Sequence, residues 1–280
     1  AMGFLRLHAG RTTMILDAAP PPTGAASVRA HASTLAFEMS SGRHPVVVNC
    51  GAGERFGGDW PRAARATAAH STAQIARLSS SEIAEDGFAT RRLGAWLLSV
   101  PRAVSAERTD DLNGSWILAD HDGFAARYGL RHLRRLFVAP DGRDIRGEDT
   151  IEAASKAERS RFDRELGQAR QLGEPFTLHF HLHPDVEPEL DPGGTSARLT
   201  LPGGEVWSFR QASGELALAS SAYLDPEAAA PRTTRQIVVT GRILQYRGQV
   251  TWALVRGDAA ERPRAPSVVP TRTRRPRALG

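Results

Sequence analysis

The chain has a single cysteine, a single lysine and no long apolar run. Cys50 excludes a disulfide within the chain but leaves the redox compartment open. Lys156 is the only lysine, so the basic residues are almost all arginine. No stretch approaches the ~18 to 20 consecutive apolar residues that a membrane-spanning helix needs. We therefore expect a globular protein with no membrane contact.

A targeting segment is also absent. The first ten residues, AMGFLRLHAG, contain neither the basic nor the apolar region of a signal peptide, and a strand-like run follows almost at once. We expect no signal peptide in this chain, which we interpret as a fragment of a longer protein. Its compartment is left unknown.

The positive charge belongs to the C-terminal end. Residues 262–280, RPRAPSVVPTRTRRPRALG, contain six arginines and no acid, so their removal would change the net charge from +5 to −1. The stretch is rich in proline and has no hydrophobic period, which predicts disorder. We predict one domain over residues 1–257 and a disordered Pro/Arg-rich tail over 258–280. A basic tail binds nucleic acid without specificity at most.

Short alternating runs dominate the rest of the sequence. Segments such as GSWILADHDGF, FTLHFHLH and QVTWALVRG recur at roughly ten-residue intervals between Gly, Pro and Asp, a pattern typical of antiparallel sheets. This predicts an all-β fold, a large antiparallel β-sandwich with one or two short helices. The expected helices are an Ala/Arg-rich stretch at 59–78 and a stripe of Ile151, Ala154, Phe162, Leu166 and Ala169, which we expect to be a surface helix.

The run FTLHFHLHPDV places histidines at every second position. On a strand, Phe176, Leu178, Phe180 and Leu182 share one face, and His179, His181 and His183 share the other. Such a histidine face either contributes to a metal site, with further ligands from elsewhere, or is hydrogen bonded or exposed. The spacing alone decides for neither.

Several stretches together resemble the C-terminal domain of the heparinase II/III-like polysaccharide lyases. In order they are AHASTLAFEMSSGRHPVVVNCG, ARATAAHSTAQI, DHDGFAARYGLRHLRRLFVAPDGRDIRGEDTI and FHLHPDV. The likeness covers about residues 10 to 255 and is specific, because unrelated motifs agree in order and spacing. It implies a β-sandwich, which in the family is joined to an N-terminal α/α toroid domain that is missing here.

The resemblance also implies a reaction. The family cleaves acidic, uronate-containing polysaccharides by β-elimination. A base removes the proton at C5, the charge on the carboxylate is neutralised, and an acid protonates the leaving oxygen. Most of these groups come from the toroid, so we predict that the chain alone is inactive as a lyase. By analogy with the family, the compartment would be the periplasm.

The family's metal site maps onto His31, Asn49 and His70. Asn49 stands where the family has an aspartate, so the set has lost its anionic oxygen and should bind zinc more weakly. The implied cofactor is a structural divalent metal, zinc or another. No other cofactor is expected.

Arg29 stands at the position of a family histidine. A guanidinium stays protonated and cannot act as a base. Arg29 could instead bind the substrate carboxylate bidentately, or it could be an ordinary exposed arginine. Arg65 and His183 are the other candidate substrate contacts, and the catalytic residue is left unknown.

The sequence therefore leaves two hypotheses for the function. The first is the C-terminal domain of a polysaccharide lyase that binds acidic glycan. The alternative is a non-catalytic glycan-binding or scaffold domain that docks a helical partner, which predicts a wide apolar patch beside residues 29–70.

Overall fold

Two large antiparallel sheets make up most of the structure. The computed structural model describes residues 3–85, 87–166 and 173–257. In the first sheet the order is β1 (Phe4–Ala9), β2 (Thr12–Asp17), β3 (Phe37–Ser41), β4 (His44–Val48), β12 (Glu174–Leu182), β17 (Arg232–Ile243) and β16 (Glu215–Tyr223), and β5 (Ala73–Ile75) pairs with β12. In the second it is β13 (Glu187–Leu190), β14 (Ser196–Thr200), β15 (Val206–Gln211), β18 (Arg247–Arg256), β11 (Asp144–Glu152), β10 (Leu130–Val138), β9 (Gly114–Phe124) and β8 (Val104–Asp111).

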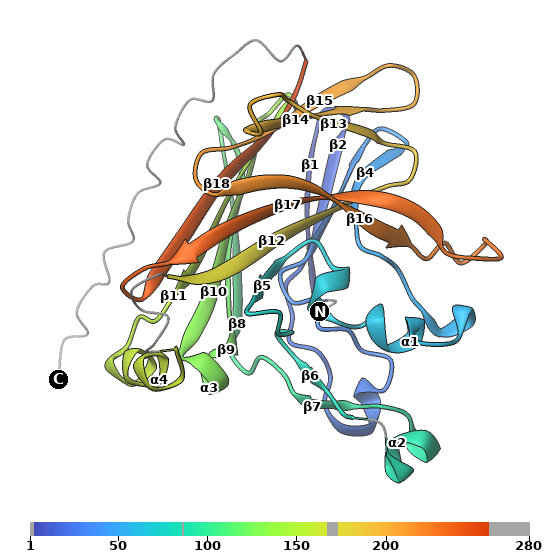
Figure 1. Cartoon of the computed structure of the whole chain (residues 1–280). Coiled ribbons are helices and arrows are strands. Elements are labelled where there is room, and N and C mark those ends of the chain that lie inside the picture. Colours follow the sequence, from blue (N-terminus) through green and yellow to red (C-terminus); the bar gives the residue numbers. More distant parts are fainter. Residues whose placement is uncertain (1–2, 86, 167–172, 258–280) are drawn as a thin grey trace.

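The helices and a small third sheet gather at one end of the sandwich, away from β13, β14 and β15 (Figure 1). The small sheet pairs β6 (Glu82–Ile83) with β7 (Leu97–Ser99). The α-helices are α1 (Trp60–Ala63), α2 (Phe88–Leu93), α3 (Ala125–Tyr128) and α4 (Lys156–Leu166). Short 3-10 turns are η1 (Gly24–Ser27), η2 (Glu54–Phe56) and η3 (Thr67–Ala69).

Aromatic side chains join the two sheets. Phe37 of β3 stacks on Trp252 of β18, with ring centroids 5.5 Å apart, and Phe180 of β12 meets the same indole edge to face. The predicted core face of β12 is confirmed, since Phe176, Leu178, Phe180 and Leu182 are all fully buried. Burial of each such side chain stabilises the fold by about 1.5 to 3 kcal/mol.

A charged cluster lies inside this core. Asp149 accepts hydrogen bonds from Arg134 and His132, each 2.7 Å long, and from the Trp252 indole at 2.8 Å. Burial alone would raise the pKa of Asp149, but the charges and hydrogen bonds of Arg134 and His132 together outweigh it, so this pKa is lower than usual. Gly147 leaves room for the indole, because a Cβ atom there would lie 2.1 Å from the Trp252 ring.

The same arginine ties the second sheet to the site described below. Arg134 Nη1 donates to the carbonyl oxygens of Leu35, at 2.6 Å, and Ser71, at 2.9 Å. One carboxylate and two carbonyls thus bind Nε and Nη1 of this buried guanidinium, while its Nη2 has no hydrogen-bond partner among the described residues. The segments RHLRR and RGED of the third stretch quoted for the family resemblance thus contribute to the core.

The β-sandwich prediction is confirmed, and the two helix predictions fare differently. Of the helix expected at 59–78, only the first turn forms, as α1 with Pro61 near its start. The rest of the prediction is wrong, because the hydroxyl groups of Thr67 and Ser71 donate to the distant carbonyls of Ala32 and Val48. The surface helix is confirmed as α4, although Ile151 belongs to β11. The small helices α2 and α3 were not expected. Ala169 and the tail at 258–280 lie outside the described residues.

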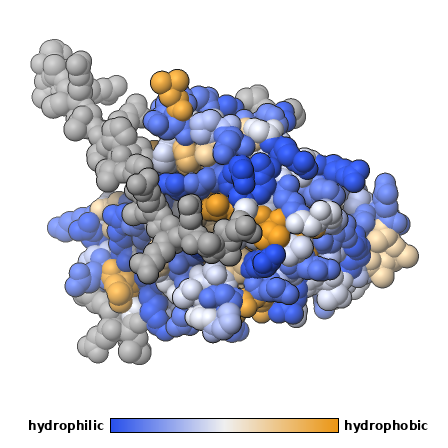
Figure 2. Space-filling view, turned by 90° about the horizontal axis from the view of Figure 1, so that it is seen from above, coloured by the Kyte–Doolittle hydropathy of each residue, from blue (hydrophilic) through white to orange (hydrophobic). Residues whose placement is uncertain are grey.

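The exterior is mainly polar. Seen from above, the surface carries mostly hydrophilic side chains, with apolar residues in small separate groups (Figure 2). No helix in the described residues is both long enough and apolar enough to cross a membrane.

Candidate functional site

Two histidines that are far apart in the chain meet at the edge of the first sheet. His31 lies in the loop before β3, and His70 directly follows η3. His31 Nδ1 lies 3.0 Å from His70 Nε2, and the two rings pack edge to face. His70 is buried and His31 is half-buried.

Hydrogen bonds between the segments 27–32 and 64–70 hold this pair together. Arg65 donates to three backbone carbonyls, those of Ala30 (2.7 Å), Ser27 (2.9 Å) and Ala95 (2.6 Å). The Ala32 amide donates in turn to the Arg65 carbonyl at 2.8 Å. Arg65 is therefore buried and fixes the backbone just before His31, a placement that favours a structural role over a substrate contact.

Both imidazoles are neutral at neutral pH. Burial, together with the smaller effect of the neighbouring His31, lowers the pKa of His70 to about 3. Burial, opposed by the charge of Glu54, also lowers the pKa of His31. His70 Nδ1 donates to the carbonyl of Ala66 at 2.8 Å, so its lone pair lies on Nε2 and points at His31.

The single N–H of a neutral His31 has two competing acceptors. One is His70 Nε2, which faces His31 Nδ1, and the other is any acceptor that faces His31 Nε2. A divalent cation between the two rings would use the lone pairs of His31 Nδ1 and His70 Nε2 and would place the N–H of His31 on Nε2. Metal-binding histidines commonly donate their other N–H to a carbonyl, as His70 does to Ala66.

Asn49 lies at the end of β4 beside this pair. Its Oδ1 accepts a hydrogen bond from the Ser71 amide at 2.8 Å, and its Nδ2 donates to Glu38 Oε1 at 3.0 Å. These two contacts fix the side-chain amide next to the residue that follows His70. The sequence-predicted metal set of His31, Asn49 and His70 is thus brought together.

A pocket of about 340 Å³ contains all three of these residues. Its other polar walls are Glu38, Asp17 and Ser33, and its apolar edge is formed by Phe4, Ile15 and Ala36. Ser33 Oγ donates to Asp17 Oδ2 at 2.6 Å, yet burial dominates and raises the pKa of Asp17.

The donor set fits a zinc ion in part. Tetrahedral zinc with Zn–N distances of about 2.05 Å places two ligand nitrogens about 3.3 Å apart, close to the separation of the two histidine nitrogens. The amide oxygen of Asn49 is a neutral third donor that already accepts one hydrogen bond. Within the described residues no group of three His, Cys, Asp or Glu is arranged around one point. The metal role of His31, Asn49 and His70 stays a prediction.

Arg29 lies two residues before His31 and is exposed. It has no hydrogen bond or ion pair with the described residues, so its guanidinium is available to a ligand. Residues 29–70 themselves expose no large hydrophobic side chain, but the exposed side chains of Phe4 and Ile15 line the pocket beside them. The wide apolar patch expected for a docked domain stays a prediction.

His183 is separate from the pocket. Its ring packs edge to face on Tyr223, and its Nδ1 lies 3.5 Å from Asp185 Oδ2 at the end of β12. The carboxylate of Asp185 is also paired with Arg232 at 2.7 Å. The role of His183 as a substrate contact stays a prediction.

The other histidines of this strand are hydrogen bonded. His179 Nδ1 lies 2.9 Å from Gln236 Oε1, and His181 binds Ser221 Oγ through Nδ1 and the Ala68 carbonyl through Nε2. Both rings are buried, and the groups that bind them come from β16, β17 and η3. This confirms hydrogen bonding for His181 rather than an exposed face.

Sequence reasoning missed two contributors to this pocket. Glu38, which accepts hydrogen bonds from both the backbone and the side chain of Asn49, was not singled out, although it ends the F-E part of the first family stretch. The sequence did contain a signal for Glu38, because it is the one acid within the otherwise apolar run TLAFEM. Asp17 had no such signal, because it ends an ordinary strand.

Comparisons with known proteins agree with this fold and these motifs. Residues 1–253 match the family model described as heparinase II/III-like, C-terminal. FtsZ-localized protein C of Caulobacter vibrioides is 30% identical over 257 residues, which are 91% of this chain and 42% of that protein.

Solved structures extend the likeness to the fold alone. The heparan sulfate lyase HepC of Pedobacter heparinus aligns over 94% of this chain with a TM-score of 0.66 at 14% identity, and the heparinase III product BT4657 aligns over 91% with a TM-score of 0.64 at 11% identity. The chain spans 36% and 35% of those two proteins and less than half of the Caulobacter relative.

Proposed function

Since this chain belongs to the heparinase II/III-like C-terminal domain family, we propose that it binds an acidic, uronate-containing polysaccharide at the pocket of His31 and His70. The observation that carries the proposal is the pocket that joins His31, His70 and Glu38, with an unpaired Arg29 two residues before His31 in the chain. A free guanidinium binds a carboxylate through two parallel hydrogen bonds. The exposed ring of Phe4 offers an apolar surface at the edge of the pocket.

A divalent metal, zinc in the first instance, is part of the proposal. His31 and His70 would hold it, with Asn49 as a weaker third donor. When bound, the ion would supply positive charge that offsets Asp17 and Glu38 in the pocket. Asn49→Asp should lower the thermal stability of the metal-free domain, because two carboxylates then meet at Glu38, and should enlarge the stabilisation that zinc provides.

The lyase reaction belongs to the proposal only in the full-length protein. Arg29 would neutralise the carboxylate while another domain removes the C5 proton, since a guanidinium cannot take it. We expect negligible activity from the chain alone. A rise in the unsaturated-uronate absorbance with heparan- or alginate-type polymers would contradict this.

The binding proposal is tested by affinity electrophoresis in gels that contain the polymer. Arg29→Gln should weaken binding about tenfold or more, the value of one charge-assisted contact. Arg43→Gln, a change of another exposed arginine in the turn between β3 and β4, is the matched control. Equal retardation of the wild type and Arg29→Gln would reject the proposal.

A second candidate is a non-catalytic scaffold. The relative at 30% identity is named for localisation with FtsZ, and Arg29 replaces the family histidine. A separate exposed apolar group, Phe88, Leu93 and Leu98, lies on α2 and β7. Co-sedimentation with FtsZ polymers that is lost in Phe88→Ser with Leu93→Ser, while glycan binding is unchanged, would favour this function.

A further inference from the structure

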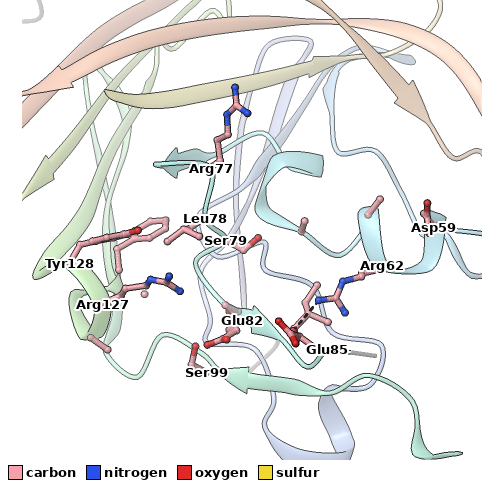
Figure 3. A pocket seen from close by; sticks show the side chains of 17 residues that line it. Asp59, Arg62, Arg77, Leu78, Ser79, Glu82, Glu85, Ser99, Arg127 and Tyr128 are labelled. Atoms are coloured by element: carbon pink, nitrogen blue, oxygen red, sulfur yellow. Dashed lines mark hydrogen bonds between the residues drawn. The ribbon is translucent and has the colours of Figure 1, made fainter. Parts of the chain in front are cut away.

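A second, larger pocket of about 740 Å³ opens between α1, α3 and the small sheet of β6 and β7 (Figure 3). It shares no lining residue with the pocket of His31 and His70. One residue connects the two pockets: Ala66 lines the larger pocket, and its carbonyl accepts the hydrogen bond from the His70 ring in the smaller one. Its volume lies in the usual range for small-molecule sites.

The charges around this pocket balance. Three arginines and three acids line it, namely Arg62, Arg77, Arg127, Asp59, Glu82 and Glu85. The Arg62 guanidinium donates to the carbonyls of Ala84 and Ile83. A polyanion gains little from such a pocket, because the acids repel it as strongly as the arginines attract it.

Charged groups of both signs are free to bind a ligand. Arg127 projects from α3 into the opening. Glu82 of β6 and Glu85, two residues after the end of β6, lie on the opposite wall of the pocket (Figure 3). None of these three side chains has a hydrogen bond or an ion pair with the described residues. In a concave surface, unpaired charges act on a ligand more strongly than on a flat one.

The remaining walls suit a ring-shaped polar ligand. Tyr128 and Leu78 form an apolar side, and Ser79 and Ser99 offer hydroxyl groups. Arg77 borders the rim in a two-residue turn in which it and Ala76 have left-handed φ angles of +62° and +48°. Ile75 and Leu78 pair across this turn, and two positive φ angles in succession are the geometry of a two-residue hairpin turn.

We propose that this pocket binds a disaccharide unit in which a uronate carries a carboxylate and the neighbouring amino sugar carries an unsubstituted amine. Arg127 pairs with the carboxylate, Glu82 and Glu85 pair with the ammonium group, and Tyr128 packs against the ring. The inference rests on the proposed binding of uronate glycan and narrows it to polymers in which some amino sugars are neither acetylated nor sulfated.

Calorimetry with three disaccharides of glucosamine and glucuronate tests the inference. They differ only at the nitrogen, which is free, acetylated or sulfated. We expect the free amine to bind about tenfold or more tightly than the acetylated form, which loses the charge, and the sulfated form to bind most weakly. The double variant Glu82→Gln with Glu85→Gln should abolish this order, and Arg127→Gln should weaken all three.

Arg235→Gln and Glu215→Gln, changes at exposed positions on β17 and β16, are the controls and should leave the order unchanged. Equal affinity for the free and acetylated forms, or affinity that rises with sulfation, overturns the inference. If the polymer still binds in an Arg29-dependent way in that case, the proposed function stands and only this inference fails. If neither polymer nor disaccharide binds, both fail.

Discussion

His31 Nδ1 lies 3.0 Å from His70 Nε2, although 39 positions separate the two residues in the chain. The contact exists because Arg65 and Ala32 fasten the loop before β3 to the segment that contains η3. Burial keeps both rings neutral, which leaves ring nitrogens able to bind a cation. Arg29, two residues before His31 in the same loop, is exposed to solvent.

Removal of either imidazole should abolish zinc binding. We expect the wild type to bind one zinc ion per chain and to gain about 2.7 kcal/mol of unfolding free energy at zinc concentrations 100 times Kd. His31→Ala and His70→Ala should show neither effect in metal analysis and thermal unfolding. His8→Ala, a change of an exposed histidine on β1, is the control. Stoichiometric zinc in His31→Ala would contradict the assignment.

Arg65→Lys separates a structural role from a substrate role. A lysine cannot reach all three carbonyls, and loss of charged hydrogen bonds should lower the unfolding free energy by about 2 kcal/mol or more. Glycan affinity measured well below the melting temperature should stay near that of the wild type. A variant with unchanged stability but tenfold weaker binding would instead make Arg65 a substrate contact.

The buried ion pair predicts a large effect at Asp149 and a small one at its neighbour. Asp149→Asn leaves the Arg134 guanidinium buried without its counter-charge, which should lower the unfolding free energy by about 3 to 5 kcal/mol. Glu148 pairs with Arg135 near the surface at 3.4 Å, so Glu148→Gln should change it by less than about 1 kcal/mol. Urea denaturation measures both, and similar losses would show that the pair is not buried as described.

Stability should decrease as pH falls below about 6.5, the usual pKa of an unfolded histidine. Burial lowers the pKa of His181 to about 3 in the folded state, so between these values the unfolded chain binds a proton that the folded chain does not. One such group gives a slope of about 1.4 kcal/mol per pH unit, with full stability above the window. His181→Gln should reduce the slope between pH 6 and 4. Unfolding free energy that is constant from pH 7 to 5 would contradict this.

Local pattern predicts some parts of this fold and not others. The alternation in FTLHFHLH identifies the buried face of β12, because side chains on a strand alternate regardless of context. It does not show that His179 and His181 are buried as well, since the groups that bind these rings, such as Ser221 and Ala68, come from distant parts of the chain. The Ala-rich stretch at 59–78 favours a helix locally, but tertiary hydrogen bonds of Thr67 and Ser71 override that preference.

The candidate site depends even more on distant contacts. No periodicity relates His31, Asn49 and His70, and only the family resemblance placed them together. The charge-balanced pocket is assembled from α1, α3, β6 and β7, whose pairing depends on the folded core. None of its charged residues stands out in the sequence from other exposed charges.

Glycan binding at the pocket of His31 and His70 is tested most directly by nuclear magnetic resonance. The labelled domain is titrated with an oligosaccharide of glucuronate and N-acetylglucosamine, and backbone amide shifts are followed. We predict that the shifts gather at residues 29–33, 49–51 and 70–72 and weaken in Arg29→Gln. Shifts that are absent there, or that gather instead at β13, β14 and β15 at the opposite end, would contradict the proposed function.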